Sequence, residues 1–345
     1  MAQDSPLRLV ITGATGFTGR ALLRRLASEP RGLVSARALV RRDPDGLAAS
    51  HLTPVPGSLP DLSPDCAAQL FPAEPHVLVH LAGHNVGRPA DFQRVNVEGT
   101  RQLLSALPAS CVGIVHGSSL SVLGQAAQEG VDETEPTAPQ TALARSRLAA
   151  EQLVLEAAQA RRIGALVLRP RFVVGQGDAA TLPGLLRLAR QGVVLGTGQQ
   201  RWSVIDVDDY AEVILRLCRR LSMGSVMRGP LHVGYSRPIS FDEVRSALGQ
   251  SFELPPVRWR IPVSIRATRW MARLPLSGLR GLATRMELVG LSHHARTTRL
   301  SAVVGASLLD QDPRVVVARA ARHLCGAAAS PTFQTSSASS SGTPT

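Results

Sequence analysis

The stretch Leu9–Arg20, with the sequence LVITGATGFTGR, constrains the fold of this chain more than any other. It begins as a short apolar run and continues into a turn in which Gly13, Gly16 and Gly19 stand three residues apart. In a phosphate-binding turn the first glycine allows the sharp bend, the second lets the backbone approach a pyrophosphate, and the third lets the helix pack on the strand. Free amides at the start of the helix, from Phe17 onward, would then face the anion.

The residues around this turn favour the same interpretation over an ordinary glycine-rich loop. Leu7–Thr12 is predicted to form a strand, Gly16–Ser28 carries apolar residues at helical spacing, and Ala38–Val40 is predicted to form a second strand. A strand–helix–strand unit is the context that a dinucleotide-binding turn requires. The residues that we assign to cofactor contact in the turn are Gly13, Thr15, Gly16, Phe17 and Gly19.

Two arginines, Arg41 and Arg42, follow the second strand, about 20 residues beyond the glycine turn. In a dinucleotide-binding fold the residue at this place binds the adenosine ribose. An acidic residue there would accept a hydrogen bond from a 2′-hydroxyl, whereas an arginine would donate charge-assisted hydrogen bonds to a 2′-phosphate. NADP(H) is therefore favoured over NAD(H). A solvated pair is the alternative, because all 38 basic residues of this chain, which has a net charge of +12, are arginines.

Strands and helices continue to alternate over about 170 residues, which predicts an α/β protein with a doubly wound parallel sheet. Further strands are expected at Leu52–Val55, His76–His80 and Cys111–His116, and a helix at 91–107. The histidines and the four cysteines show no metal-ligand spacing, so no metal site is predicted.

Six motifs, in one order, resemble the extended short-chain dehydrogenase/reductase family, its NAD-dependent epimerase/dehydratase group, and most of all the hydroxysteroid-dehydrogenase-like and dihydroflavonol-reductase-like branches. The resemblance implies a Rossmann fold that binds NAD(P), with a smaller, mostly helical substrate lobe. The motifs are TGATGFTG at 12–19, VLVHLAG at 77–83, VNVEGTRQLL at 95–104, GSSLSVLG at 117–124, LVLRPRFVVGQGD at 166–178 and RWSVIDVDDYA at 201–211.

The same resemblance implies an active site with one departure. Ser119 matches the serine that bonds the substrate oxygen, but Leu143 stands at the tyrosine and Arg147 at the lysine of the family's YxxxK pair. Arginine can still bond the ribose hydroxyls, whereas leucine cannot donate a proton. His84, at the carboxyl edge of a strand, is a candidate substitute donor.

Two further positions, Ala82 and Asn96, are assigned to the cofactor site together with Arg147. In the family the asparagine of the NVxGT motif lies near the catalytic helix. A buried polar cap is the alternative role for Asn96.

Two functions stay open. The first is an NADPH-dependent reductase, epimerase or dehydratase that acts on a small-molecule carbonyl or hydroxyl substrate and takes its proton from Ser119, His84 or water. The second is a non-catalytic dinucleotide-binding regulatory or accessory protein. General acid–base catalysis contributes roughly 10²- to 10⁴-fold in rate, so loss of the tyrosine without a substitute would leave a weak enzyme.

The domain organisation follows from these assignments. The predicted parts are a dinucleotide-binding domain of residues 1–175 completed by 203–235, a substrate lobe of 176–202 and 236–325, and a disordered tail of 326–345 that is low in apolar residues.

The segment 257–300 contains nine arginines, one acidic residue and two tryptophans. We expect it to form the substrate lobe with a basic exterior, or to contact an anionic membrane surface or a protein partner. Specific nucleic-acid binding is not expected, since the arginines lack aromatic interleaving over most of the chain. With no signal segment and no long apolar run, a soluble, cytoplasmic protein is expected.

Overall fold

A parallel sheet of seven strands organises the computed structural model, which describes residues 6–41, 51–271 and 278–328. The order of the strands is β12-β7-β5-β4-β1-β2-β3, and every neighbouring pair is parallel. This arrangement confirms the predicted doubly wound sheet. The strands are β1 (Leu7–Thr12), β2 (Val34–Val40), β3 (Leu52–Pro56), β4 (His76–His80), β5 (Cys111–Gly117), β7 (Gly164–Pro170) and β12 (Arg228–Val233).

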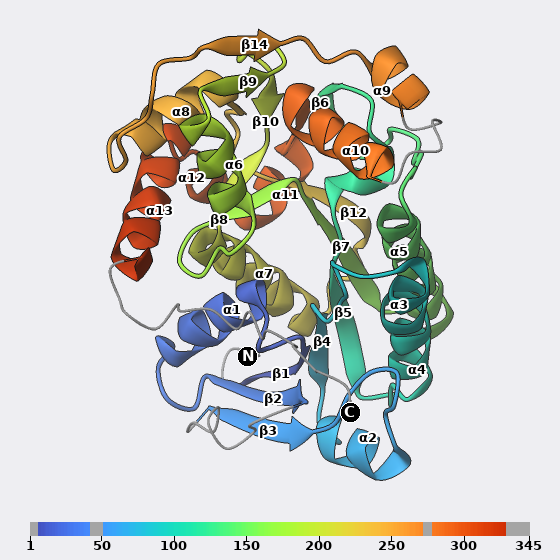
Figure 1. Ribbon diagram of the computed structural model, residues 1–345. Helices are drawn as coiled ribbons and strands as arrows, with labels where there is room; N and C mark the ends of the chain where they lie inside the picture. The colour runs from blue at the N-terminus through green and yellow to red at the C-terminus, as the bar shows by residue number, and fades with distance from the viewer. Residues whose placement is uncertain (1–5, 42–50, 272–277, 329–345) are drawn as a thin grey trace, which may run out of the picture.

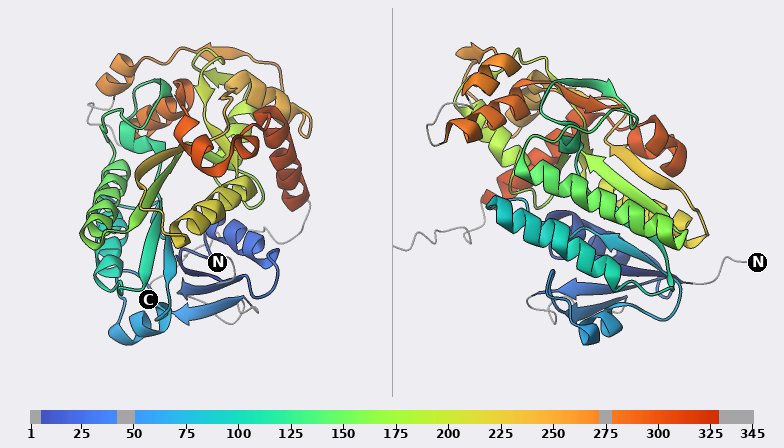
Figure 2. Two further views of the ribbon diagram at one scale, coloured as in Figure 1. Left: turned by 180° about the vertical axis from the view of Figure 1, so that it is seen from behind. Right: turned by 90° about the vertical axis from the view of Figure 1, so that its right-hand side faces the viewer.

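Helices cover both faces of this sheet (Figure 1). On one face α1 (Phe17–Ala27) packs against α7 (Val207–Ser222), and on the other α4 (Gly99–Ser105) lies beside α5 (Ala142–Arg161), as the right-hand view of Figure 2 shows in teal and green. The alternation of side chains along β1 explains the two layers, because Leu9 belongs to the core on the α1 face and Val10 to the core on the other.

The order in which strands are added to the sheet reverses beside β1. The chain runs outward from β1 through β2 and β3 and then returns to β4 on the other side of β1. Carboxyl ends of parallel strands open a crevice at such a reversal, which is where ligands bind in open α/β sheets. The glycine turn after β1 lies at this point.

The helix predicted over 91–107 differs in detail. It starts earlier, as α3 (Pro89–Phe92), continues as a π-helical stretch at Gln93–Glu98 and ends as α4. The widened turns carry Asn96, whose side chain bonds backbone and side-chain groups outside the helix. Apolar periodicity does not reveal a local widening of this kind.

The second lobe, above the sheet in Figure 1, is built from short strands as well as helices. Its largest sheet has the order β13-β10-β15-β6, and β6 comes from inside the range predicted for the dinucleotide-binding domain. The strands of the lobe are β6 (Gln128–Val131), β10 (Arg201–Trp202), β13 (Ile239–Ser240), β15 (His293–Ala295), and the pair β9 (Val193–Leu195) and β14 (Trp259–Ile261). A further parallel pair, β8 (Phe172–Val174) and β11 (Val204–Asp206), falls within the ranges predicted for the dinucleotide-binding domain. The helices are α6 (Thr181–Arg190), α8 (Phe241–Gly249), α9 (Ile265–Met271), α10 (Leu279–Gly290), α11 (Thr298–Val304), α12 (Ala306–Leu309) and α13 (Pro313–Ala328).

Some predictions fall at the limits of the described residues. Arg42 lies outside them, as do residues 329–345 of the predicted tail. The first residues of that predicted tail are helical instead, because α13 continues to Ala328. Within the described ranges, none of the helices has the length and apolar character needed to cross a bilayer.

Candidate functional site

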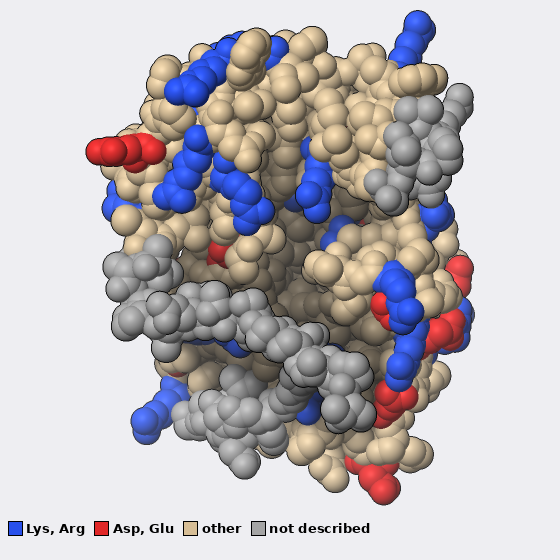
Figure 3. All heavy atoms as spheres, in the orientation of Figure 1, with Lys and Arg blue, Asp and Glu red and all other residues tan. Residues whose placement is uncertain are grey.

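A cavity of about 460 Å³ lies at the carboxyl ends of the central strands, beneath the loop that leads into α6. Figure 3 shows the surface hollowed between the sheet and the second lobe. The predicted site residues that line the cavity are Gly13, Gly16, Phe17, Gly19, Ala82, Asn96, Ser119 and Arg147. Those that are not in the lining are Thr15, Arg41, His84 and Leu143.

The three glycines of the turn meet different surroundings. Gly13 has φ of +75°, and a Cβ there would lie 2.5 Å from the backbone nitrogen of Ala82. A Cβ on Gly19 would collide with the carbonyl oxygen of Gly13 and lie 2.7 Å from Ala14 Cα. A Cβ on Gly16 would have just one neighbour within 4 Å, the Gly13 carbonyl oxygen at 3.2 Å. Gly13 and Gly19 thus serve close packing, while Gly16 leaves space on the cavity side.

The first residues of α1 line this space and bring no acidic side chain of their own. Gly16 is the N-cap residue and provides no side-chain cap, and the first turn of α1 contains no acidic residue. The first backbone N–H groups of a helix have no partner within the helix and carry the positive end of its dipole. These features fit a phosphate or pyrophosphate group.

A second part of the site lies where β5 ends. Ser119 Oγ accepts a hydrogen bond from the Ser121 amide (3.2 Å), and its own proton has no acceptor within the described part of the chain. Arg147 donates from Nη1 to Ser121 Oγ (3.2 Å) and from Nη2 to Asn85 Oδ1 (2.9 Å). Burial lowers the pKa of Arg147 to about 10, which leaves the guanidinium charged at neutral pH. A cation and a free hydroxyl therefore belong to one small cluster.

A buried ion pair lies next to this cluster. One turn after Arg147 on α5, Glu151 binds Arg169 of β7, with 2.5 Å between Oε2 and Nη2. Ser118 also donates its hydroxyl to Glu151. Since Arg169 and Ser118 occupy the carboxylate, Glu151 does not pair with Arg147.

Asn96 and His84 are bound to each other. The Asn96 side chain accepts from the His84 amide (2.6 Å) and donates to the His84 carbonyl (3.1 Å) and to Ser146 Oγ (2.9 Å). Asn96 thus ties the loop after β4 to α5 and also lines the cavity. The His84 ring is tilted against Phe92, with 6.1 Å between ring centroids, and His84 is not in the cavity lining.

Several lining residues were not assigned to the site from the sequence, among them Arg171 and Tyr210. Arg171 directly follows β7, and its place just beyond the carboxyl end of a predicted strand is the signal that could have identified it. Burial, and after it the charge of Arg147, lower the pKa of Arg171 to about 9. Tyr210, far from the glycine turn in sequence, reaches the cavity because α7 packs beside α1. Burial raises the pKa of its phenol.

Comparisons with known proteins agree with this architecture. Residues 9–227 match the NAD dependent epimerase/dehydratase family. A ceramide reductase from Caulobacter vibrioides is 32% identical over 256 residues, which cover 69% of this chain and 74% of that protein. A GDP-6-deoxy-D-mannose reductase from Pseudomonas aeruginosa is 31% identical over 238 residues, covering 63% and 71%.

A solved structure, RMD from Pseudomonas aeruginosa complexed with NADPH, superposes with a TM-score of 0.65 at 22% identity. The superposition covers 92% of this chain and 98% of that one. It supports the overall fold, including the second lobe.

Proposed function

The chain belongs to the NAD dependent epimerase/dehydratase family, and from that membership we propose that it binds a nicotinamide dinucleotide and reduces the carbonyl group of a small molecule. One observation carries the proposal: the open glycine turn and the Ser119–Arg147 cluster line the same cavity. The named relatives include a ceramide reductase and a sugar-nucleotide reductase, and a fold neighbour holds NADPH, which supports a reductive use of the cofactor.

The chain offers a fitting place for each part of such a cofactor. The amides after Gly16 would hold the pyrophosphate, and Arg147, with Ala82 and Asn96, would hold the ribose and nicotinamide end. When bound, the cofactor supplies a hydride. We assign cofactor binding to the domain of residues 1–175 and 203–235. We assign substrate binding to the lobe of residues 176–202 and 236–325, to which β6 adds a strand.

The residues of the chain then act on the substrate oxygen. Ser119 donates its free proton to that oxygen and orients the carbonyl. Arg147 stabilises the negative charge that develops on the oxygen, because a fixed cation in a partly dry cavity interacts with it more strongly than water does. The final proton comes from water, either directly or through Ser119, which passes on its proton and takes one back from water; Leu143, at the position we assign to the family's tyrosine, has no proton to give.

Leu143 also favours a second candidate function, a non-catalytic protein that binds the dinucleotide as a regulatory or accessory subunit. Leu143 precedes Arg147 by one turn of α5 and is absent from the cavity lining. With Leu143 assigned to the position of the family's tyrosine, the proposed site has no tyrosine to donate a proton. The two functions differ in turnover and not in cofactor binding.

A panel of carbonyl compounds, with NADPH oxidation followed by absorbance, separates the two. If the chain is a reductase, the wild type turns over at least one compound, Ser119→Ala slows it by about 100-fold, and His84→Ala has little effect because His84 is not in the cavity lining. Firm NADPH binding without turnover, together with activity in the double variant Leu143→Tyr/Arg147→Lys, would favour the non-catalytic protein.

We also propose that NADP(H) binds more tightly than NAD(H). Arg41 directly follows β2 and is exposed, where it can reach a 2′-phosphate. Calorimetric titration of both cofactors into the wild type and into Arg41→Ala tests this. Equal affinities, or a preference that Arg41→Ala does not reduce, would contradict the proposal.

The outer end of the second lobe supports a peripheral contact with an anionic membrane surface. Trp259 on β14 and Trp270 on α9 are 68% and 64% exposed, and exposed arginines accompany them. A basic exterior of the substrate lobe without any partner is the alternative. We further propose a cytoplasmic location, which four unpaired cysteines support.

A further inference from the structure

Two arginines, Arg147 of α5 and Arg171 just after β7, line the cavity together. Their charges are close enough to act on each other, since Arg147 makes the charged form of Arg171 less favourable. Two like charges in one cavity repel, and removal from water weakens the screening between them. The pair therefore needs a compensating group.

Neither guanidinium has a carboxylate partner within the described part of the chain. Arg147 binds two neutral oxygens, those of Ser121 and Asn85. Arg171 donates from Nη2 to the Leu288 carbonyl (3.3 Å), while its Nε is buried and has no described partner. A buried donor without an acceptor is costly unless a ligand supplies one.

Among the described residues, the acidic groups near the pair form no ion pair with either arginine. The charge of Glu151 favours the charged form of Arg147, but the Glu151 carboxylate is bound to Arg169. His293, whose pKa is lowered to about 3 by burial and then by the charge of Arg171, is neutral. Asp178, the acidic residue in the cavity lining, accepts from three amides at the start of α6.

The surroundings of Arg171 also hold it in place. The guanidinium carbon lies 5.3 Å from the centre of the Phe172 ring, and the Leu288 bond fixes one end of the planar group. A guanidinium held in this way is suited to grip two oxygens of a carboxylate or a phosphate at once. An ammonium or an amide would not offer the same geometry.

We propose that Arg147 and Arg171 form an anion subsite that holds a carboxylate or phosphate group of the substrate close to Ser119. The inference rests on the proposed reductase function and narrows its substrate to an acidic carbonyl compound. The subsite is distinct from the glycine turn, where the amides of α1 serve the anion of the cofactor. Arg147 contacts both the cofactor and the substrate, whereas Arg171 contacts the substrate alone.

Calorimetric titration of the full chain, saturated with NADP⁺, tests the subsite with three probes. These are 3-oxooctanoate, its uncharged methyl ester and octyl phosphate. We expect the wild type to bind one of the two anions at least 10-fold more tightly than the ester. Arg171→Met should weaken the binding of that anion by about 10- to 100-fold and leave the affinity for the ester unchanged. The better of the two anions identifies the class of acid.

A matched control is Arg190→Met. Arg190 of α6 also lies over a phenyl ring, Phe252, at 5.3 Å, but it is exposed and does not line the cavity. Anion binding should be the same in this variant as in the wild type. Arg171→Lys, which keeps the charge and loses the fork, should bind the anion with an affinity between those of the wild type and Arg171→Met.

Three results would overturn the subsite. The first is that the wild type binds the ester and the anions equally, and the second is that it binds neither anion. The third is that Arg171→Met loses affinity for NADP⁺ as much as for the anion, which would place Arg171 in the cofactor site. Failure of the wild type to bind NADP⁺ at all is a different result, because it contradicts the proposed function itself.

Discussion

At the scale of residues, Gly16 and Gly19 are three positions apart and yet depend on the absence of a Cβ for different reasons. Gly16→Val places a side chain on the open side of the turn, where Gly13 O is its one near neighbour. We expect dinucleotide binding to be lost while the free energy of unfolding falls by no more than about 1 kcal/mol, the range for an altered N-cap. Titration with NADPH and chemical unfolding measure the two effects.

Gly19→Val is the matched control for that variant. Its Cβ would overlap the backbone of Gly13 and Ala14, so α1 could no longer pack against the turn that follows β1. The loss should be in stability, by about 1–3 kcal/mol or more. If Gly16→Val binds NADPH with unchanged affinity, the phosphate site is not at this turn.

The sequence predicted much of the candidate site, because family motifs fall where strands end and strand ends meet in space. Ser119 and Arg147, which were assigned from two such motifs, both line the cavity. The sequence did not predict which way a side chain points. His84 is at the correct edge of β4 but turns its ring toward Phe92, whereas Arg171, which no motif singled out, lines the cavity.

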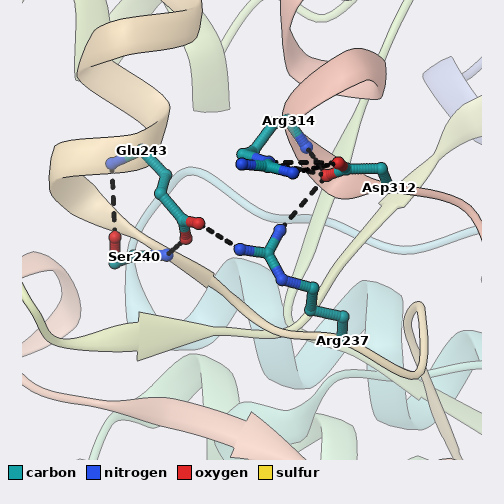
Figure 4. Close-up of polar contacts among 5 residues, drawn as sticks. All are labelled: Arg237, Ser240, Glu243, Asp312 and Arg314. Carbon is teal, nitrogen blue, oxygen red and sulfur yellow. Dashed lines mark hydrogen bonds and ion pairs between the residues drawn. The ribbon is translucent and has the colours of Figure 1, made fainter.

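At the scale of elements, one polar network joins the starts of α8 and α13 (Figure 4). Ser240 and Glu243 form a capping box at α8, with hydrogen bonds of 3.2 Å and 2.8 Å. Arg237 connects Glu243 to Asp312, whose Oδ1 is 3.1 Å from Arg237 Nη1. Asp312 also accepts from the Arg314 amide (2.9 Å), which caps the first turn of α13.

This network makes the stability of the second lobe dependent on pH. The side chain of Arg314, with smaller contributions from its amide and from Arg237, lowers the pKa of Asp312 to about 2. A carboxyl group with a lowered pKa stabilises the fold above its ordinary pKa near 4, and that contribution is lost as the pH falls toward 2. Asp312→Asn, which can still cap, should lower stability by up to about 1 kcal/mol at pH 7.

The measurement is urea unfolding of the wild type and of Asp312→Asn at several pH values. The difference between them should stay constant from about pH 7 to 5 and shrink below about pH 4. Asp312→Ala loses the cap as well and should be less stable than Asp312→Asn by about 1 kcal/mol. A difference that grows as the pH falls would contradict this role of the ion pairs.

Elements of the sheet were predicted more closely than those of the second lobe. β1 and β4 have the predicted limits, because buried parallel strands are short apolar runs with clear breaks on either side. β10 and β13 are two residues long and too short to show any period. Their pairing depends on contacts between distant segments, which periodicity does not report.

At the scale of the whole molecule, β14 and α9, which carry the exposed Trp259 and Trp270, lie at the outer end of the second lobe, opposite the sheet. Figure 1 shows β14 and α9 at the edge of the molecule that is farthest from β3. All three residues of β14 are exposed, and so are Arg266 and Arg269 of α9. Contact through this end would leave the seven-stranded sheet free on the other side.

Co-sedimentation with vesicles tests whether this end binds an anionic bilayer. We expect binding to vesicles that contain phosphatidylserine at low ionic strength, and loss of most binding near 1 M salt, where the Debye length falls to about 3 Å. The double variant Trp259→Ala/Trp270→Ala should bind several-fold more weakly, because each indole would otherwise enter the interface. Val226→Ala, which alters an apolar residue that is 65% exposed outside this segment, is the control and should bind like the wild type. Equal binding to uncharged vesicles, or binding that the tryptophan changes leave intact, would mean that the basic exterior serves the substrate lobe without a membrane.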